Sequence, residues 1–236
     1  MTLAPWFVIE MAGNDVVLDS TDTFEVSRPK DELPPTVLPV MPVIKDAETW
    51  IFNASTNTVY FIRTGNIYDD SALGFYYSKC LNKQNIILQT DATKINQTSG
   101  RPMVSGSIIA FGGRFANKVT RYYEDQGLAK IVFSQNSTHY MFMKGSTVAY
   151  AVAKATYNCS REDYFVMQVL QDNSRLVFLI WGIEYTGTYA SGFSFVDIVY
   201  PNLASYNEVY YIFKWAYLDG NGIQTSNEIT QVASGS

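Results

Sequence analysis

The segment from Asp219 to Glu228, DGNGIQTSNE, carries oxygen-bearing side chains of the kind that bind calcium. An EF-hand loop places oxygen ligands at alternating positions and a bidentate acid at its twelfth position. Asp219 and Asn221 fit the first two ligand positions, but Ile223 occupies the third and Glu228 comes at the tenth position of the loop. Two alternatives follow: a shortened calcium site formed by Asp219, Asn221 and Glu228, or a polar turn between two strands.

A glycine pair, Gly112-Gly113, offers a second kind of chemistry because it lies between an apolar run and a helical pattern. Unpaired N–H groups at a helix N-terminus attract anions, so Gly112, Gly113, Arg114 and Asn117 are candidate ligand-binding residues. The pair lacks the GxGxxG fingerprint and the acidic partner of dinucleotide sites. Packing is therefore the favoured interpretation, with Asn117 tying the turn to the neighbouring strand.

Catalytic patterns are sparse. His139 is the single histidine, so any Ser-His-Asp arrangement must use it, and no GxSxG motif accompanies it. The acid pairs Asp69-Asp70, Glu124-Asp125 and Glu162-Asp163 are adjacent in sequence, and we expect their side chains to point apart, capping helices or facing solvent. The sequence favours a non-enzymatic protein without a cofactor, and leaves open a carboxylate pair that only the fold would assemble.

The elements around the glycine pair predict an α/β fold. Ser107–Phe111 reads as a strand, Ala116, Val119 and Tyr123 recur on one helical face, and Gly127 stands where a helix C′ glycine is expected. A further strand follows over 128–133. Strand, helix and strand form a βαβ unit, for which a right-handed parallel crossover is expected.

The remaining pattern extends this class to a mixed, partly parallel sheet with flanking helices, a three-layer Rossmann-like core and a β-rich C-terminal half. A helix that Asp69 or Asp70 caps should direct Leu73, Tyr77 and Cys80 inward. The segment 187–202 could form a helix or, over SFVDIVY, a strand; a helix that ends before Pro201 is favoured. Strands are expected at 58–63, 85–90, 139–143, 163–170, 175–183, 208–218 and from 228, with a hairpin turn at 172–174.

Prolines divide the chain. Pro29, Pro34, Pro35, Pro39 and Pro42 block continuous helix and central strand, so residues 1–45 are expected to form an extended arm or small β appendage and residues 46–236 an α/β surface domain. The N-terminus has no basic region and Glu10 interrupts its apolar run, which predicts neither a signal peptide nor a membrane span. If the natural protein is exported, this chain is expected to be a mature form or a fragment.

Composition bears on partners and compartment. The net charge is −5, with 17 basic against 22 acidic residues and no basic stripe, which argues against nucleic-acid binding. Only 17% of residues are charged, as suits a protein outside the cytoplasm.

Cys80 and Cys159 allow either one disulfide or two buried thiols. N-x-[ST] sequons, which are candidate glycosylation sites in loops or at strand edges, begin at Asn53, Asn96, Asn136 and Asn158.

Three segments, in order, carry a resemblance: SIIAFGGRFANKVTRYYED, DYFVMQVLQDNSRLVFLIWGIEYTGTYAS and IFKWAYLDGNGIQTSNEITQV. Together they resemble the recurring domain of archaeal S-layer and S-layer-like cell-surface proteins, over roughly Thr58 to Val232. Arg114 replaces a proline of that pattern and Thr186 is inserted before its glycine, so the resemblance is to a divergent member. The matching residues are Gly112, Gly113, Asn117, Gly182, Gly187, Thr188, Ala190, Trp215, Asp219, Gly220, Asn221, Gly222, Glu228 and Ile229.

The resemblance implies an extracellular structural protein of the cell envelope that packs against copies of itself or other envelope proteins. A virion surface protein of an archaeal virus would share these features. The alternative from the residues alone is a ligand-binding or hydrolytic α/β domain. Its site would lie at the C-terminal edge of the parallel strands, where Gly112 and Arg114 would meet Thr64 or Asp91.

Overall fold

A computed structural model describes residues 7–11, 14–18, 41–52, 58–81, 83–218 and 225–236. The chain divides into two compact units, residues 1–36 and 37–236, where the sequence predicted 1–45 and 46–236. In the first unit, β1 (Phe7–Met11) and β2 (Asn14–Leu18) pair as an antiparallel hairpin. Of the clustered prolines, Pro42 alone lies within the described residues.

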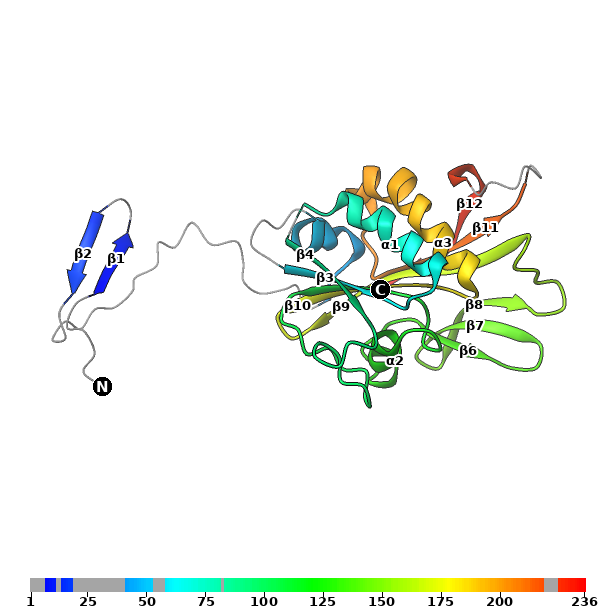
Figure 1. Ribbon diagram of the computed structural model, residues 1–236. Coiled ribbons are helices and arrows are strands. Elements are labelled where there is room, and N and C mark those ends of the chain that lie inside the picture. The colour runs from blue at the N-terminus through cyan, green and yellow to red at the C-terminus, as the bar shows by residue number, and fades with distance from the viewer. Residues whose placement is uncertain (1–6, 12–13, 19–40, 53–57, 82, 219–224) are drawn as a thin grey trace. The chain divides into compact units, whose positions relative to one another are not determined.

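The second unit is built on a seven-stranded mixed sheet in the order β12-β11-β9-β10-β5-β3-β4 (Figure 1). Strands β10, β5, β3 and β4 are parallel, and β9, β11 and β12 extend the sheet antiparallel, which confirms the partly parallel sheet. The strands are β3 (Thr58–Arg63), β4 (Lys83–Leu88), β5 (Ser107–Phe111), β9 (Glu162–Asp172), β10 (Arg175–Gly182), β11 (Tyr210–Ala216) and β12 (Ile229–Gly235).

Helices and a small sheet cover the two faces (Figure 1). On one face α1 (Ile67–Lys79) packs beside α3 (Tyr185–Ser194), over a core that includes Tyr76 and Phe178. On the other face lie α2 (Lys118–Asp125) and an antiparallel sheet of β6 (Val132–Gln135), β7 (His139–Lys144) and β8 (Thr147–Ala153). Both faces of β5 are therefore buried, as its apolar sequence requires.

Short helical turns complete the second unit. Two precede the first strand of the large sheet, two follow α3 and one precedes β12. Pro201 lies in the first turn of one of them, where its missing N–H costs no hydrogen bond, and the α-helix has already ended at Ser194. The turns are η1 (Ile44–Asp46), η2 (Glu48–Phe52), η3 (Phe195–Val199), η4 (Tyr200–Ser205) and η5 (Ser226–Glu228).

The βαβ unit expected over residues 105–133 does not form. β6 does not pair with β5 but with β7 in the small sheet. The two parallel neighbours of β5 are β3 and β10. The physical reason is burial, since seven of the eight residues of β10 are buried whereas β6 carries the polar residues Ser134 and Gln135. A central position in a sheet covered on both faces selects the more apolar strand. The βαβ unit present is β3-α1-β4.

Two predictions for α1 are wrong: neither Asp69 nor Asp70 is its N-cap, and Tyr77 does not point inward. Asn66 is its N-cap, with Oδ1 accepting a hydrogen bond from the Tyr68 N–H at 2.9 Å. The inward tyrosine is Tyr76, because Tyr77 is 40% exposed. Predictions that depend on turn chemistry are confirmed: Asn173 has a φ of 55° in the β9–β10 hairpin, and Gly127 has a φ of 67° after α2.

Within the described residues, no helix has the length and apolar character needed to cross a membrane.

Candidate binding cleft

A cleft of about 410 Å³ opens beyond the carboxyl ends of β3, β5 and β10. The chain runs from β3 to β4 on one side and returns to β5 on the other, so the loops after β3 and β5 leave in different directions. Open α/β sheets bind ligands at such reversals. The cleft is lined by Asn66, Asp69, Gly112, Gly113, Arg114, Phe115, Ala116, Phe133, Gln135, Tyr140, Trp181, Gly182, Ile183, Glu184, Tyr185 and Thr188.

Asp69 supplies a carboxyl group to this cleft. It is 3% exposed, and its Oδ2 accepts a hydrogen bond from the Thr64 hydroxyl at 2.8 Å. Burial raises the pKa of Asp69, although that hydrogen bond acts to lower it. Gly112 has a φ of 91°, and a Cβ added there would lie 2.8 Å from Asp69 Oδ2. The glycine therefore allows the carboxyl group to approach the end of β5.

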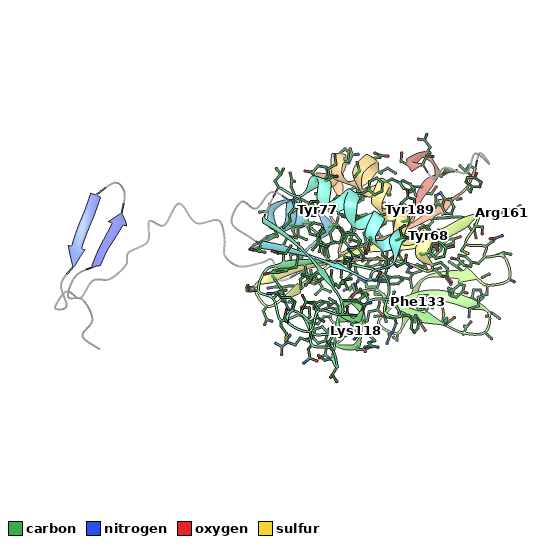
Figure 2. The ribbon with its side chains drawn as sticks, viewed as in Figure 1. Tyr68, Tyr77, Lys118, Phe133, Arg161 and Tyr189 are labelled. Atoms are coloured by element: carbon green, nitrogen blue, oxygen red, sulfur yellow. The ribbon has the colours of Figure 1, made fainter. Side chains whose placement is uncertain are left out.

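Aromatic side chains form much of the cleft wall. Trp181 is fully buried and stacks on Phe142, with ring centroids 5.2 Å apart. Its Nε1 is buried and has no hydrogen-bond partner among the described residues. Phe133 meets Trp181 edge-on at 6.1 Å. This wall belongs to the side of the sheet that carries β6 and β7, where Figure 2 labels Phe133.

The rim of the cleft is also aromatic. Phe115 is 81% exposed and meets Phe133 edge-on at 5.9 Å. Tyr185, at the start of α3, is 42% exposed and lies 4.3 Å from the ring of Tyr68 on α1. Figure 2 shows Tyr68 and Tyr189 on the helical side of the sheet, across from Phe133. Exposed rings therefore flank the cleft on both sides.

Arg114 brings a positive charge to the cleft, but the protein already balances it. Its guanidinium lies 2.7 Å from Asp125 Oδ1 and 3.3 Å from Glu124 Oε2. The expectation that this acid pair points apart is wrong, because one arginine contacts both carboxylates. Burial raises the pKa of Glu124 to about 8, and its Oε1 has no hydrogen-bond partner in the described part of the chain.

The start of α2 is not arranged for an anion, because its first N–H groups have protein partners. Lys118 N–H donates to Gln89 Oε1 at 2.8 Å and Val119 N–H donates to Asn117 Oδ1 at 2.9 Å. Asn117 Nδ2 donates to the carbonyl of Phe111 at 2.8 Å and to that of Ile62 at 3.4 Å. The prediction that Asn117 ties the turn to a neighbouring strand is confirmed.

Asp163 at the start of β9 is a buried acid whose role the sequence did not predict. Its carboxylate accepts hydrogen bonds from the Thr186 hydroxyl at 2.7 Å and the Gly187 N–H at 2.6 Å, so it caps α3 from another strand. The Tyr157 hydroxyl also donates to it, at 2.9 Å. Burial raises the pKa of Asp163 to about 7 even though these hydrogen bonds lower it. The sequence did carry a signal for this role, because Asp163 stands near the start of a long apolar strand.

In the candidate calcium segment, Glu228 joins the two ends of the loop. Its Oε1 accepts from the Leu218 N–H at 2.8 Å, and its Oε2 accepts from the Thr225 N–H at 3.0 Å and Trp215 Nε1 at 3.2 Å. Burial acts to raise its pKa, but these donors lower it overall. Asp219 and Asn221 lie outside the described residues. Within the described part, no three His, Cys, Asp or Glu residues gather as a metal site.

The sequons lie in turns where they are described. Asn96, Asn136 and Asn158 are exposed, and the Oδ1 of each accepts the N–H two residues later, at 2.9–3.1 Å. Asn53 lies outside the described residues. Cys80 is buried and its thiol donates to the Ile51 carbonyl at 3.2 Å, whereas Cys159 is half-buried, and no disulfide joins these two described residues.

The cleft contains part of the pocket expected from the sequence. Gly112 and Arg114 line it, and Thr64 reaches it through Asp69. Asp91 does not line it, because its Oδ1 accepts hydrogen bonds from the Thr93 N–H and hydroxyl in an exposed turn. His139 lies on β7 beside Thr138 and is not a lining residue. Comparison with models of known protein families, and with curated proteins, finds no match for this sequence.

Proposed function

We propose that the second unit is a non-enzymatic recognition domain of an archaeal cell-envelope protein, similar to S-layer proteins, that works outside the cell. It binds copies of itself or other envelope proteins, and the cleft beyond β3, β5 and β10 is its binding surface. One observation carries this proposal: Phe115 and Tyr185 expose aromatic rings on the rim of the cleft. Aromatic side chains are enriched in the buried centres of protein interfaces, and exposed apolar clusters mark interaction sites.

The contacts of the resembling residues support membership in a recurring domain. Gly112 makes room for Asp69, Asn117 ties α2 to two strands, and Glu228 joins the ends of a loop. A Cβ on Gly187 would lie 2.8 Å from the carbonyl oxygen of Tyr164. These positions maintain the frame around the cleft. We also propose that the parallel half is Rossmann-like, since α1 and α2 cover opposite faces of the reversal between β3 and β5.

The test measures association and location. An antibody raised against the second unit should label intact cells of the source organism, and the purified protein should associate in analytical ultracentrifugation or bind an envelope extract. Phe115→Ser should weaken that association at least tenfold. Leu81→Ser is the matched control, because Leu81 is 79% exposed and does not line the cleft. Labelling only after lysis would contradict the envelope location, and equal effects of both variants would remove the cleft from the proposal.

A hydrolytic function is the second candidate, and one observation favours it. Asp69 on α1 and Glu184 at the start of α3 bring two carboxyl groups to one cleft, and burial raises the pKa of the first. Hydrolases can use two carboxyl groups in one cleft as acid and base. Turnover of chromogenic esters, phosphates or glycosides by the wild type, abolished by Asp69→Asn, would support it. Equal turnover by wild type and Asp69→Asn would overturn it.

A further inference from the structure

We propose that the cleft binds a pyranose sugar, a neutral ring with an apolar C–H face and a hydroxylated edge. The inference rests on the proposed use of the cleft for binding and adds the chemical class of the ligand. The volume of about 410 Å³ falls in the range of about 300–1,000 Å³ typical of small-molecule sites.

The apolar face of a sugar matches the aromatic surface of this cleft. Phe115, Tyr140 and Tyr185 each line the cleft and are exposed at least in part. The face of an aromatic ring carries partial negative charge, so it attracts the weakly positive C–H groups of a pyranose ring. Phe115 and Tyr185 stand on the rim, where a ring can enter without displacing a core residue.

The hydroxylated edge of a sugar matches the polar groups between those rings. A hydroxyl both donates and accepts hydrogen bonds, a carboxylate accepts them, and an amide side chain does both. Asp69 and Glu184 provide carboxyl oxygens and Gln135 provides an amide. Trp181, whose buried Nε1 has no partner among the described residues, also lines the cleft.

The charge balance of the cleft favours a neutral ligand over an anion. Among the described residues that line it, Arg114 is the cation, and the Asp125 carboxylate, 2.7 Å away, neutralises that charge. The N–H groups of Lys118 and Val119 donate to side chains, so the start of α2 offers little to a phosphate. Phosphate sites need an unbalanced cation or free amides.

Such a sugar has two sources in an envelope: an N-linked glycan on a second copy of this chain, or a polysaccharide. Asn96, Asn136 and Asn158 are exposed sequon residues that would carry the first. Both sources present the same pyranose chemistry to the cleft. They differ in whether enzymatic removal of N-glycans from the protein abolishes association between copies.

The test titrates the full chain with methyl glycosides of glucose, galactose, mannose and N-acetylglucosamine while following the tryptophan indole N–H signals by NMR. The signal of Trp181, assigned through Trp181→Phe, should shift with at least one glycoside. Phe115→Ala should weaken that binding at least fivefold, and Leu81→Ala should leave it unchanged. Asp69→Asn, which keeps the shape of the side chain, should also weaken it. No shift with any glycoside, or equal binding by Phe115→Ala, overturns the sugar proposal.

Two further arms identify the source and separate this inference from the proposed function. If copies associate through glycans, enzymatic deglycosylation of protein from source cells abolishes association while added glycosides still bind. If the source is a polysaccharide, an isolated envelope polysaccharide binds deglycosylated wild-type protein but not Phe115→Ala. Association that depends on Phe115 without any glycoside or polysaccharide binding would overturn the sugar proposal and leave the recognition function standing.

Discussion

At the scale of single residues, three buried acids have different tasks in this protein. Asp163 caps α3, Glu124 lies 3.3 Å from the Arg114 guanidinium at the edge of the cleft, and Asp69 faces the cleft itself. Their positions in sequence do not distinguish them, since each belongs to a pair of adjacent acids. The difference lies in the donors that other elements bring to each carboxyl group.

Replacing Asp163 should be costly. Asp163→Ala leaves the buried Gly187 N–H and the half-buried Thr186 hydroxyl without their acceptor. We expect a loss of roughly 2–4 kcal/mol in the free energy of unfolding, measured by urea denaturation. Its neighbour gives the control: Glu162 forms a partly exposed ion pair with Lys214, so Glu162→Ala should cost less than about 1 kcal/mol. Equal losses would show that Asp163 is not the principal cap.

Glu124 predicts a pH dependence of stability. Burial raises its pKa in the folded protein from 4.5 to about 8, so the folded state holds a proton that the unfolded state releases above pH 4.5. This contribution is fully present below pH 4.5 and is lost as the pH rises through about 8. The temperature of the thermal midpoint should therefore decrease as the pH is raised from 5 to 9. Glu124→Gln should flatten this decline, and a decline identical to that of the wild type would contradict the assignment.

At the scale of elements, α2 depends on one side chain at its start. Asn117 accepts from the Val119 N–H and donates to the carbonyls of Phe111 and Ile62, so it joins the helix to β5 and β3. Gln89 completes the arrangement by accepting the Lys118 N–H. The glycine turn before α2 is thus held by the Asn117 cap and by Gln89, which comes from the segment after β4.

Substitutions at Asn117 should separate capping from tethering. Asn117→Ser retains a capping oxygen but cannot donate through an amide, and Asn117→Ala loses both functions. We expect losses of about 1–2 kcal/mol for serine and about 2–4 kcal/mol for alanine in the free energy of unfolding. Hydrogen exchange of the α2 amides should increase in the same order. Equal losses for the two variants would mean that the tether to Phe111 and Ile62 contributes nothing.

At the scale of the whole molecule, one sheet separates two cores. Leu73 of α1 is buried on the face covered by α1 and α3, and Leu179 of β10 is buried on the face covered by α2 and the small sheet. Because the same strands contribute side chains to both faces, neither core of the second unit can form without the sheet.

This shared sheet predicts a single cooperative unfolding transition for the second unit. Leu73→Ala and Leu179→Ala should each lower the free energy of unfolding by about 2–5 kcal/mol through loss of buried area and cavity formation. Both variants should move the same transition in urea, followed by circular dichroism and by indole NMR signals. A variant that splits the transition in two would show that the cores unfold independently.

Much of the element order was predictable from local pattern. The strand over Thr58–Arg63 and the β9–β10 hairpin follow from apolar runs and turn residues, which act within a few residues. The partner of β5 was not predictable in this way. Whether β6 or β10 pairs with β5 depends on how deeply each strand is buried, and that burial is set by tertiary packing rather than by local sequence.

The sequence by itself determined a mixed α/β domain, a glycine turn that Asn117 ties to a neighbouring strand, and a net charge of −5. Only the tertiary structure decided which groups meet. It placed Asp69, Arg114 and Glu184 around one cleft, paired the arginine with Asp125, and set exposed rings on the rim. The reason is physical: backbone pattern is set by neighbouring residues, whereas a site is made where loops from β3, β5 and β10 converge at one edge of the sheet.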